Sequence, residues 1–132
     1  MSFSIHHGSF EETLQGIETS SVKLLLTDLP YEVSNNPWDV QIDAKQAQEL
    51  LYQSNRILTR DGSLFIFLNL TQISELASIA REQGFPIIRT GVWLKTTATK
   101  RAAPYPVGAI EHWIYLSRKA DSSNPIKPFY AD

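Results

Sequence analysis

The stretch VKLLLTDLPY, from Val22 to Tyr31, decides which fold we expect for this chain. A short apolar run that ends abruptly in a turn signal is typical of a central parallel strand, and open α/β sheets bind their ligands just beyond the carboxyl ends of such strands. The apolar run Val22–Leu26 therefore predicts a buried strand. Functional side chains are expected immediately after it, at Asp28 and Tyr31.

The residues before this run predict a strand followed by a short helix. Phe3–His6 alternates apolar and polar side chains and stops at Gly8, which favours a strand. Ser9 is a suitable N-cap with Glu12 three residues later, the pattern of a capping box. Strand, helix and strand in succession make a βαβ unit, whose strands normally run parallel.

The residues after Tyr31 predict alternating helices and strands. Residues 32–41 lack periodicity and are expected to be a loop. We expect a helix from Ala44 to about Leu58, capped by Asp43 and closed by Asp61-Gly62, and then a buried strand over Ser63–Leu68. A second helix is expected to start at Asn69 or Thr71 and to end at Gly84. Two further strands are expected, one over Pro86–Lys95 with a bulge at Gly91 and one over Ile110–Ser117. If residues 96–108 form a long hairpin loop, the last two strands are antiparallel.

Length and composition exclude several classes of protein. A chain of 132 residues with 42% hydrophobic residues predicts one domain with a real core. A net charge of −2 argues against nucleic-acid binding through bulk electrostatics, and the absence of cysteine excludes disulfides, a Cys-ligated zinc site and a thiol nucleophile. We predict no metal site, since the adjacent His6 and His7 would face opposite sides of a strand. Neither a signal peptide nor an apolar run of ~20 residues is present, so we expect a cytoplasmic protein without membrane contact.

Several motifs follow one another in an order that resembles one enzyme family. After Thr27–Tyr31 come Trp38-Asp39, GSLFIF at residues 62–67, VWLK at residues 92–95 and the segment 111–119. This order is similar to the first half of the DNA amino-methyltransferases, which methylate adenine N6 or cytosine N4, of the circularly permuted type in which the catalytic motif precedes the cofactor motif. The resemblance covers Ile5–Lys119. It implies a truncated Rossmann-like methyltransferase fold, a three-layer α/β domain over residues 1–119 with a mostly parallel sheet and an antiparallel C-terminal strand, followed by an irregular tail at 120–132.

The resemblance also implies a site for an amino group. The family's acid, followed by Pro-Pro and an aromatic residue, acts on a base flipped out of the duplex. Here Asp28 and the Leu29 carbonyl would accept hydrogen bonds from the exocyclic amino group, and Tyr31 would stack on the base. Pro30 matches the second proline of the motif, whereas Leu29 replaces the first. That replacement makes the loop less rigid but keeps the backbone carbonyl that would accept the hydrogen bond.

The cofactor implied by the resemblance is S-adenosylmethionine, and the motifs for it are incomplete. Gly8 and Ser9 lie in the segment that would hold its adenosine, but Ser9 stands where the family usually has an acid. None of the six glycines stands in the Gly-x-Gly arrangement of the loop that receives the methionine part. S-adenosylmethionine is therefore implied by resemblance only, and this chain alone is expected to be inactive.

Four further residues are candidates for stacking on a base or for contacting DNA. Trp38 lies in the loop with which the family surrounds the flipped base, and Lys95, Lys100 and Arg101 follow the predicted strand. The alternatives are that Trp38 packs on the rim of the core and that the three cations form a solvated loop.

Two functions follow from this pattern. In the first, the chain keeps the target-base half of a methyltransferase and acts by binding DNA or a methyltransferase or restriction partner. In the alternative, it belongs to an active DNA adenine-N6 or cytosine-N4 methyltransferase whose cofactor half is supplied by another chain or by a longer parent protein. Because a strand as apolar as Val22–Leu26 invites association at an open edge, we expect that edge to be covered by Phe3–His6, by a second copy in a homodimer, or by a partner protein.

Overall fold

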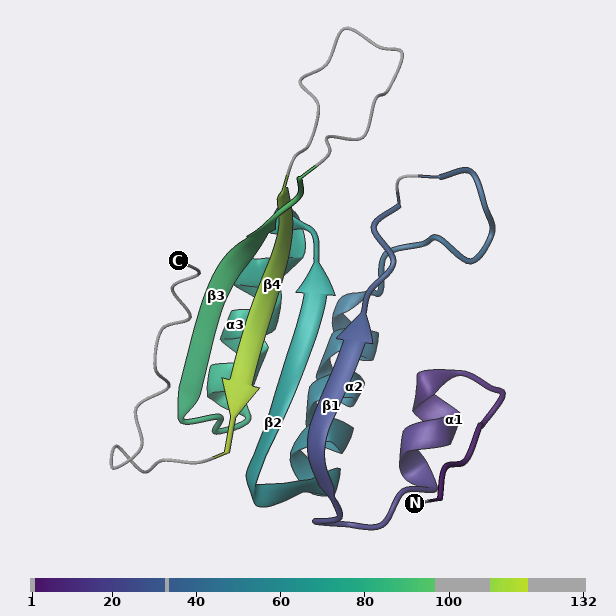
Figure 1. Cartoon of the computed structure of the whole chain (residues 1–132), viewed down its shortest axis with the longest axis vertical. Coiled ribbons are helices and arrows are strands. Elements are labelled where there is room, and N and C mark those ends of the chain that lie inside the picture. The colour runs from purple at the N-terminus through teal and green to yellow at the C-terminus, as the bar shows by residue number, and fades with distance from the viewer. Residues whose placement is uncertain (1, 33, 97–109, 119–132) are drawn as a thin grey trace, which may run out of the picture.

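The computed structural model describes residues 2–32, 34–96 and 110–118, which form one sheet and three helices (Figure 1). In chain order the elements are α1 (Phe10–Gln15), β1 (Val22–Asp28), α2 (Ala44–Ile57), β2 (Leu58–Leu68), α3 (Leu70–Glu82), β3 (Ile87–Leu94) and β4 (Ile110–Ser117). Helices α2 and α3 lie on one face of the sheet (Figure 1). None of the described helices is long and apolar enough to cross a membrane.

The sheet has four strands in the order β1-β2-β4-β3. Strand β2 pairs parallel with β1, while β4 pairs antiparallel with both β2 and β3. Strands β1, β2 and β3 therefore run in one direction and β4 alone runs in the other. The predicted α/β fold with a mostly parallel sheet and an antiparallel C-terminal strand is confirmed.

Local sequence signals set the helix ends. The side chains of Asp43 and Asn69 accept hydrogen bonds from the backbone N–H three residues later, and both caps are completed as capping boxes by Gln46 and Gln72. Gly84 follows α3 with a φ of +80°, a conformation that glycine adopts without strain. These helix positions agree with those predicted from the sequence.

The core lies between the sheet and the two long helices. Alternate residues of β2 (Leu64, Ile66, Leu68) and of β4 (Ile114, Leu116) are fully buried. They share one cluster with the inward faces of α2 and α3, whose buried apolar members are Ala47, Leu50, Leu51, Ile57, Leu76, Ala77, Ile79 and Ala80. The side chains between them on β2, such as Phe65 and Phe67, belong to the opposite face.

Two expectations about the sheet are wrong. Phe3–His6 has no strand assignment, so it does not cover β1. Strand β1 is an edge strand in the described part of the chain rather than a buried central one, and Leu24 and Leu26 are 59% and 64% exposed. In the described part, α2 and α3 cover one face of the sheet and no described helix packs on the opposite face (Figure 1).

Two glycines have different roles from those predicted. Gly62 does not close α2, since β2 already begins at Leu58; a Cβ on Gly62 would lie 2.9 Å from the Val22 carbonyl oxygen, at the irregularity where β1 and β2 change register. Gly91 is not a bulge, because β3 and β4 pair in regular register through it. Instead, the Trp113 ring occupies the space over Gly91 where a side chain would lie.

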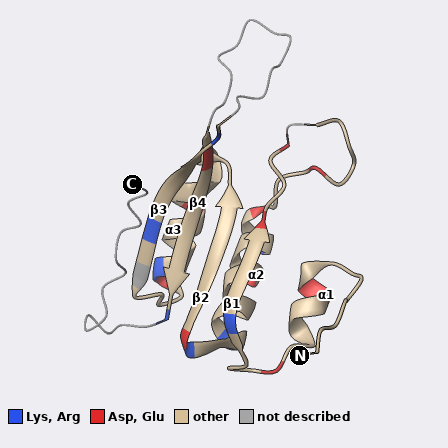
Figure 2. Cartoon of the chain, in the orientation of Figure 1, with Lys and Arg blue, Asp and Glu red and all other residues tan. Residues whose placement is uncertain are grey.

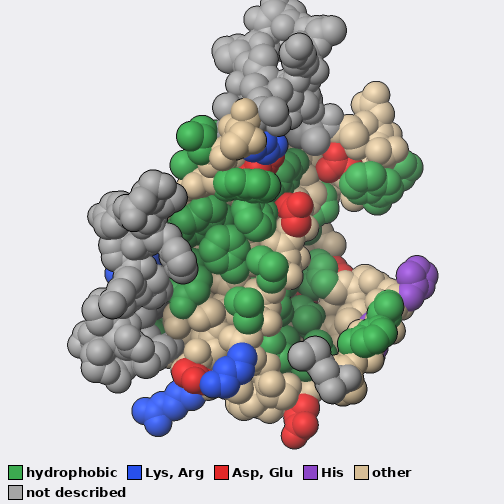
Figure 3. All heavy atoms as spheres, in the orientation of Figure 1, with side chains coloured by type: hydrophobic (Ala, Val, Ile, Leu, Met, Phe, Trp, Pro, Cys, Tyr) green, Lys and Arg blue, Asp and Glu red, His purple; other side chains and the backbone are tan. Residues whose placement is uncertain are grey.

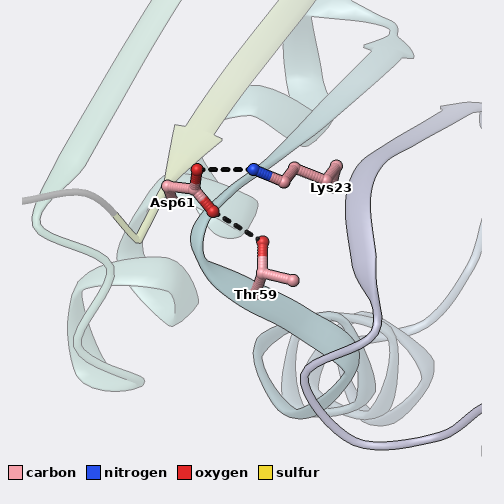
Figure 4. A network of polar contacts seen from close by, with 3 residues as sticks. All are labelled: Lys23, Thr59 and Asp61. Atoms are coloured by element: carbon pink, nitrogen blue, oxygen red, sulfur yellow. Dashed lines mark hydrogen bonds and ion pairs between the residues drawn. The ribbon is translucent and has the colours of Figure 1, made fainter.

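Polar side chains form hydrogen bonds at the ends of helices and strands. Arg56 of α2 donates to the carbonyl oxygens of Leu14 at 2.7 Å and Ile17 at 2.9 Å, which fixes the C-terminal end of α1. At the start of the sheet, Asp61 accepts from Lys23 at 2.7 Å and from Thr59 at 2.9 Å (Figure 4). This last network is exposed, so it contributes little to stability.

Candidate functional site

The loop after β1 encloses a hollow of about 380 Å³ at the carboxyl end of the strand. Its lining consists of Asp28, Leu29, Pro30, Tyr31, Ser34, Asn36, Trp38 and Asp39. Four predicted catalytic residues and the predicted stacking residue Trp38 thus come together in one place. Trp38 is 73% exposed, so it is not packed in the core.

Asp39 holds the loop closed. Its side chain is 5% exposed, and its carboxylate accepts backbone N–H groups of Tyr31 at 3.1 Å, Glu32 at 2.9 Å and Ser34 at 2.7 Å. Hydrogen bonds to a buried carboxylate are stronger than those between neutral groups. They fix the path of the backbone on which Tyr31 sits.

The backbone between Asp28 and Tyr31 is also tied to β2 and α3. The Leu29 N–H donates to the Phe67 carbonyl at 2.9 Å, which continues the pairing of β1 with β2 by one residue. The Leu29 side chain is 6% exposed, and the Pro30 carbonyl accepts from the Gln72 side chain at 3.3 Å. Leu29 therefore anchors the loop to the core although it does not match the family's proline.

Tyr31 lies near the carboxylates of Asp28 and Glu111. Burial raises the pKa of Tyr31 well above its ordinary value, and hydrogen bonding to Asp28 and the charge of Glu111 raise this pKa further. The hydroxyl thus stays protonated and can donate to Asp28. A base that brings an amino group to Asp28 has to compete with this donor.

Lys95 and Glu111 form an ion pair beside the site. Their side chains are 27% and 24% exposed, and they come from the ends of β3 and β4 nearest the Asp28 loop. Lys95 neutralises a carboxylate that faces Tyr31, so it is not available as a separate phosphate contact in this arrangement. Lys100 and Arg101 lie outside the described residues.

Gly8 and Ser9 lie at the start of α1, where Gly8 helps to form a second hollow. That hollow is lined by Ile5, His6, His7, Gly8, Glu12, Thr13, Gly16 and Ile17. The Ser9 hydroxyl already accepts the Glu12 N–H as helix cap, and a Cβ on Gly8 would lie 3.3 Å from the Glu12 carboxylate. Ser9 is therefore engaged as the cap of α1, and a side chain at Gly8 would crowd Glu12.

Sequence reasoning missed the roles of Asp39, Glu111 and Gln72. Asp39 stands in the Trp38-Asp39 motif, and this motif is the sequence signal that could have pointed to its role. Glu111 and Gln72 reach the site only through the register of the strands and the position of α3. Within the described ranges no three His, Asp or Glu side chains are grouped so that they could hold a metal ion.

Comparison with solved structures places the chain among DNA methylases in fold. TTHA0409 from Thermus thermophilus, assigned as a DNA modification methylase, is 18% identical with a TM-score of 0.62, and the match covers 89% of this chain and 53% of that one. M1.HpyAVI, solved in complex with SAM, is also 18% identical, with a TM-score of 0.57 and coverage of 89% and 56%. The cytosine-N4-specific PvuII DNA methyltransferase is 14% identical, with a TM-score of 0.59 and coverage of 86% and 48%.

The likeness at these identities is one of fold. No family model matches the sequence, and no curated protein matches it. The chain spans about half the length of the solved structures that it matches. Its α/β architecture is that of a truncated methyltransferase.

Proposed function

We propose, on the premise that this chain has the fold of the DNA methyltransferases, that it is a reduced relative which holds an amino-bearing base but does not methylate it alone. Its work is binding, to DNA or to a methyltransferase or restriction partner. The observation that carries this proposal is the Asp28–Tyr31 loop, braced by the buried carboxylate of Asp39 around an open hollow.

The chemistry of the loop suits an exocyclic amino group. Such a group has two N–H donors, and Asp28 and the Leu29 carbonyl supply acceptors at adjacent positions of the loop. Asp28 is exposed, so a base can reach it, while Leu29 is held by the core. A base that lacks the amino group offers no donor to Asp28 and should bind more weakly.

Catalysis by this chain alone is not part of the proposal. S-adenosylmethionine would supply a methyl group to the amino nitrogen, and the fold neighbours TTHA0409 and M1.HpyAVI have both been solved in complex with it. In this chain Ser9 of the predicted cofactor segment serves as the N-cap of α1, and the sequence contains no Gly-x-Gly.

Calorimetric titration tests the binding proposal. The purified chain is titrated with S-adenosylmethionine, with and without a duplex that carries one unpaired adenine. We expect heat from the duplex, loss of that heat in Asp28→Ala, and no heat from the cofactor alone. Asp61→Ala, which removes an exposed aspartate at the other end of the sheet, is the matched control. Micromolar binding of S-adenosylmethionine by the chain alone would overturn the non-catalytic proposal.

A second candidate function is an active DNA adenine-N6 or cytosine-N4 methyltransferase whose cofactor half comes from another chain or a longer parent protein. The open edge of β1, which ends at Asp28, favours it, because a strand added there would lie beside the site. Its test is methyl transfer to DNA by the chain together with a candidate partner polypeptide. A transfer rate that is unchanged in Asp28→Ala would remove Asp28 from the reaction.

The same edge supports the proposal of a homodimer. Within the described sheet, β1 has a neighbouring strand on one side only and exposes Leu24 and Leu26, the features that lead edge strands to pair with another chain. Sedimentation should show a dimer that Leu26→Pro weakens, because the Leu26 N–H alternates with that of Leu29, which points to β2, and so lies at the open edge, where proline removes it. A monomer at all concentrations would contradict it.

A further inference from the structure

The face of the sheet opposite α2 and α3 is an open apolar surface (Figure 3). The register places on it Leu24, Leu26 and Asp28 of β1, Phe65 and Phe67 of β2, Trp113 and Tyr115 of β4, and Arg89 and Trp93 of β3. Trp93 is 58% exposed. We call this surface the aromatic face.

The rings of the aromatic face lie next to one another. The centroids of Phe65 and Trp113 are 5.1 Å apart with 30° between the ring planes, and those of Phe65 and Phe67 are 5.3 Å apart. Trp93 meets Phe67 edge-on at 6.3 Å. The cluster therefore runs across three adjacent strands rather than as isolated side chains.

Gly91 provides the space in which the Trp113 ring of the cluster lies. A Cβ at this position would lie 2.2 to 2.7 Å from three atoms of the Trp113 ring, so the ring rests directly on the backbone of β3. Trp113 is only partly buried, so part of its ring remains accessible. An accessible aromatic ring is what a base needs for stacking, because every base has a π-face of its own.

Arg89 gives this face a cation that a phosphate could contact. Residues of both charges lie along the strands (Figure 2). Arg89 is exposed and makes no ion pair within the described residues, Lys95 and Glu111 neutralise each other, and Asp28 adds a negative charge beside the loop. A protein would have to place a carboxylate opposite Arg89 to avoid burying its charge unpaired, whereas every nucleotide of a nucleic acid carries a phosphate. A phosphate would instead pair with it, and its guanidinium could stack on a base.

The aromatic face is continuous with the Asp28 site. Asp28 lies opposite Phe67 in the register of β1 and β2, and Phe67 contacts both Phe65 and Trp93. A strand of nucleic acid that crosses the sheet would lead directly to the hollow of the Asp28 loop. Four-stranded sheets with exposed aromatic side chains stack about two or three bases in known single-strand-binding modules.

We infer that the aromatic face binds single-stranded DNA, with bases stacked on Trp93 and Trp113 and a phosphate at Arg89. The choice of DNA as the polymer rests on the proposed function of the Asp28 loop. The stacking itself does not, because it needs no amino group on the base.

The test is fluorescence anisotropy with a labelled oligothymidylate of about twelve nucleotides, a length within the range of known single-strand sites. Thymine has no exocyclic amino group, so this probe reports on the face and not on the Asp28 loop. We expect Trp93→Ala to weaken binding about 10- to 100-fold. Tyr52→Ala is the matched control, since Tyr52 is also 58% exposed but lies on α2.

Salt dependence tests the phosphate contact. Each phosphate contact to a single strand contributes about 0.7 to the slope of log K against log salt, so Arg89→Met should reduce that slope by about this amount. Retained helix content by circular dichroism verifies that each variant is folded.

Four results would overturn the inference. The first is that the folded wild type does not bind oligothymidylate, and the second is that Trp93→Ala and Tyr52→Ala weaken binding equally. The third is that the matching oligouridylate binds more tightly. The fourth is that DNA binding is absent while Trp93→Ala shifts a monomer-to-dimer equilibrium. The last result would assign the face to a second copy. If the oligothymidylate binds as expected but a duplex with an unpaired adenine binds no more tightly than one without it, the proposed function of the loop is refuted. The inference about the aromatic face is then still supported.

Discussion

Asp39→Asn tests most directly whether the Asp39 carboxylate stabilises the closed loop. Asparagine has nearly the shape of aspartate but only one oxygen, and it places an amide where the Ser34 N–H now donates at 2.7 Å. One hydrogen bond is lost, and the two to Tyr31 and Glu32 become bonds to a neutral acceptor. Since a hydrogen bond to a charged group contributes about 1.5–3 kcal/mol, we expect the closed loop to lose about 2 kcal/mol.

The assay is amide hydrogen exchange of the loop. A loss of about 2 kcal/mol corresponds to roughly 30-fold faster exchange of the Tyr31, Glu32 and Ser34 amides if the loop opens locally. Exchange in the middle of β2 should change much less, because the core does not depend on Asp39. Asp61→Asn serves as control, since Asp61 contacts only exposed groups. Unchanged exchange of the three amides in Asp39→Asn would refute the bracing role of this carboxylate.

Three other predictions concern stability. The pKa of Tyr31 is raised, so its neutral form stabilises the fold fully below about pH 10, where unfolded tyrosine ionises, and this contribution is lost as the pH rises toward the folded pKa. Denaturation curves of wild type should therefore lose stability above pH 10 relative to Tyr31→Phe, and parallel curves would contradict this. Gly91→Val should displace the Trp113 ring and destabilise the protein by about 1–3 kcal/mol, with a changed near-ultraviolet circular dichroism, whereas Gly16→Ala should be tolerated because the nearest atom would be 3.6 Å away. Arg56→Met should cost about 2 kcal/mol and increase exchange in α1, and equal exchange would show that α1 is held by other contacts.

Elements whose ends depend on neighbouring residues were predictable from the sequence. The N-caps Asp43 and Asn69 act on N–H groups three residues away, and Gly84 acts on its own φ angle, so each signal is local. The final strand, Ile110–Ser117, was expected with these bounds because it alternates well enough to predict a strand.

Features that depend on distant partners were not predictable. The sequence of β1 is as apolar as that of a central strand, and only the order of the sheet shows that Leu24 and Leu26 are at an edge. A strand at Phe3–His6 would need a neighbour to pair with, and alternation does not supply one. In the site, Asp28 and Tyr31 followed from the motif, whereas the carboxylate of Glu111 reaches Tyr31 only because β4 lies between β2 and β3.

The central claim is that the Asp28 loop recognises the amino group of an unpaired base without help from a cofactor. The most direct measurement compares the affinity of the chain for two duplexes, one with an unpaired adenine and one with an unpaired purine that lacks the 6-amino group. We predict about tenfold tighter binding of adenine, and loss of this difference in Asp28→Ala. Equal affinity for the two duplexes, or a preference that survives in Asp28→Ala, would contradict the account.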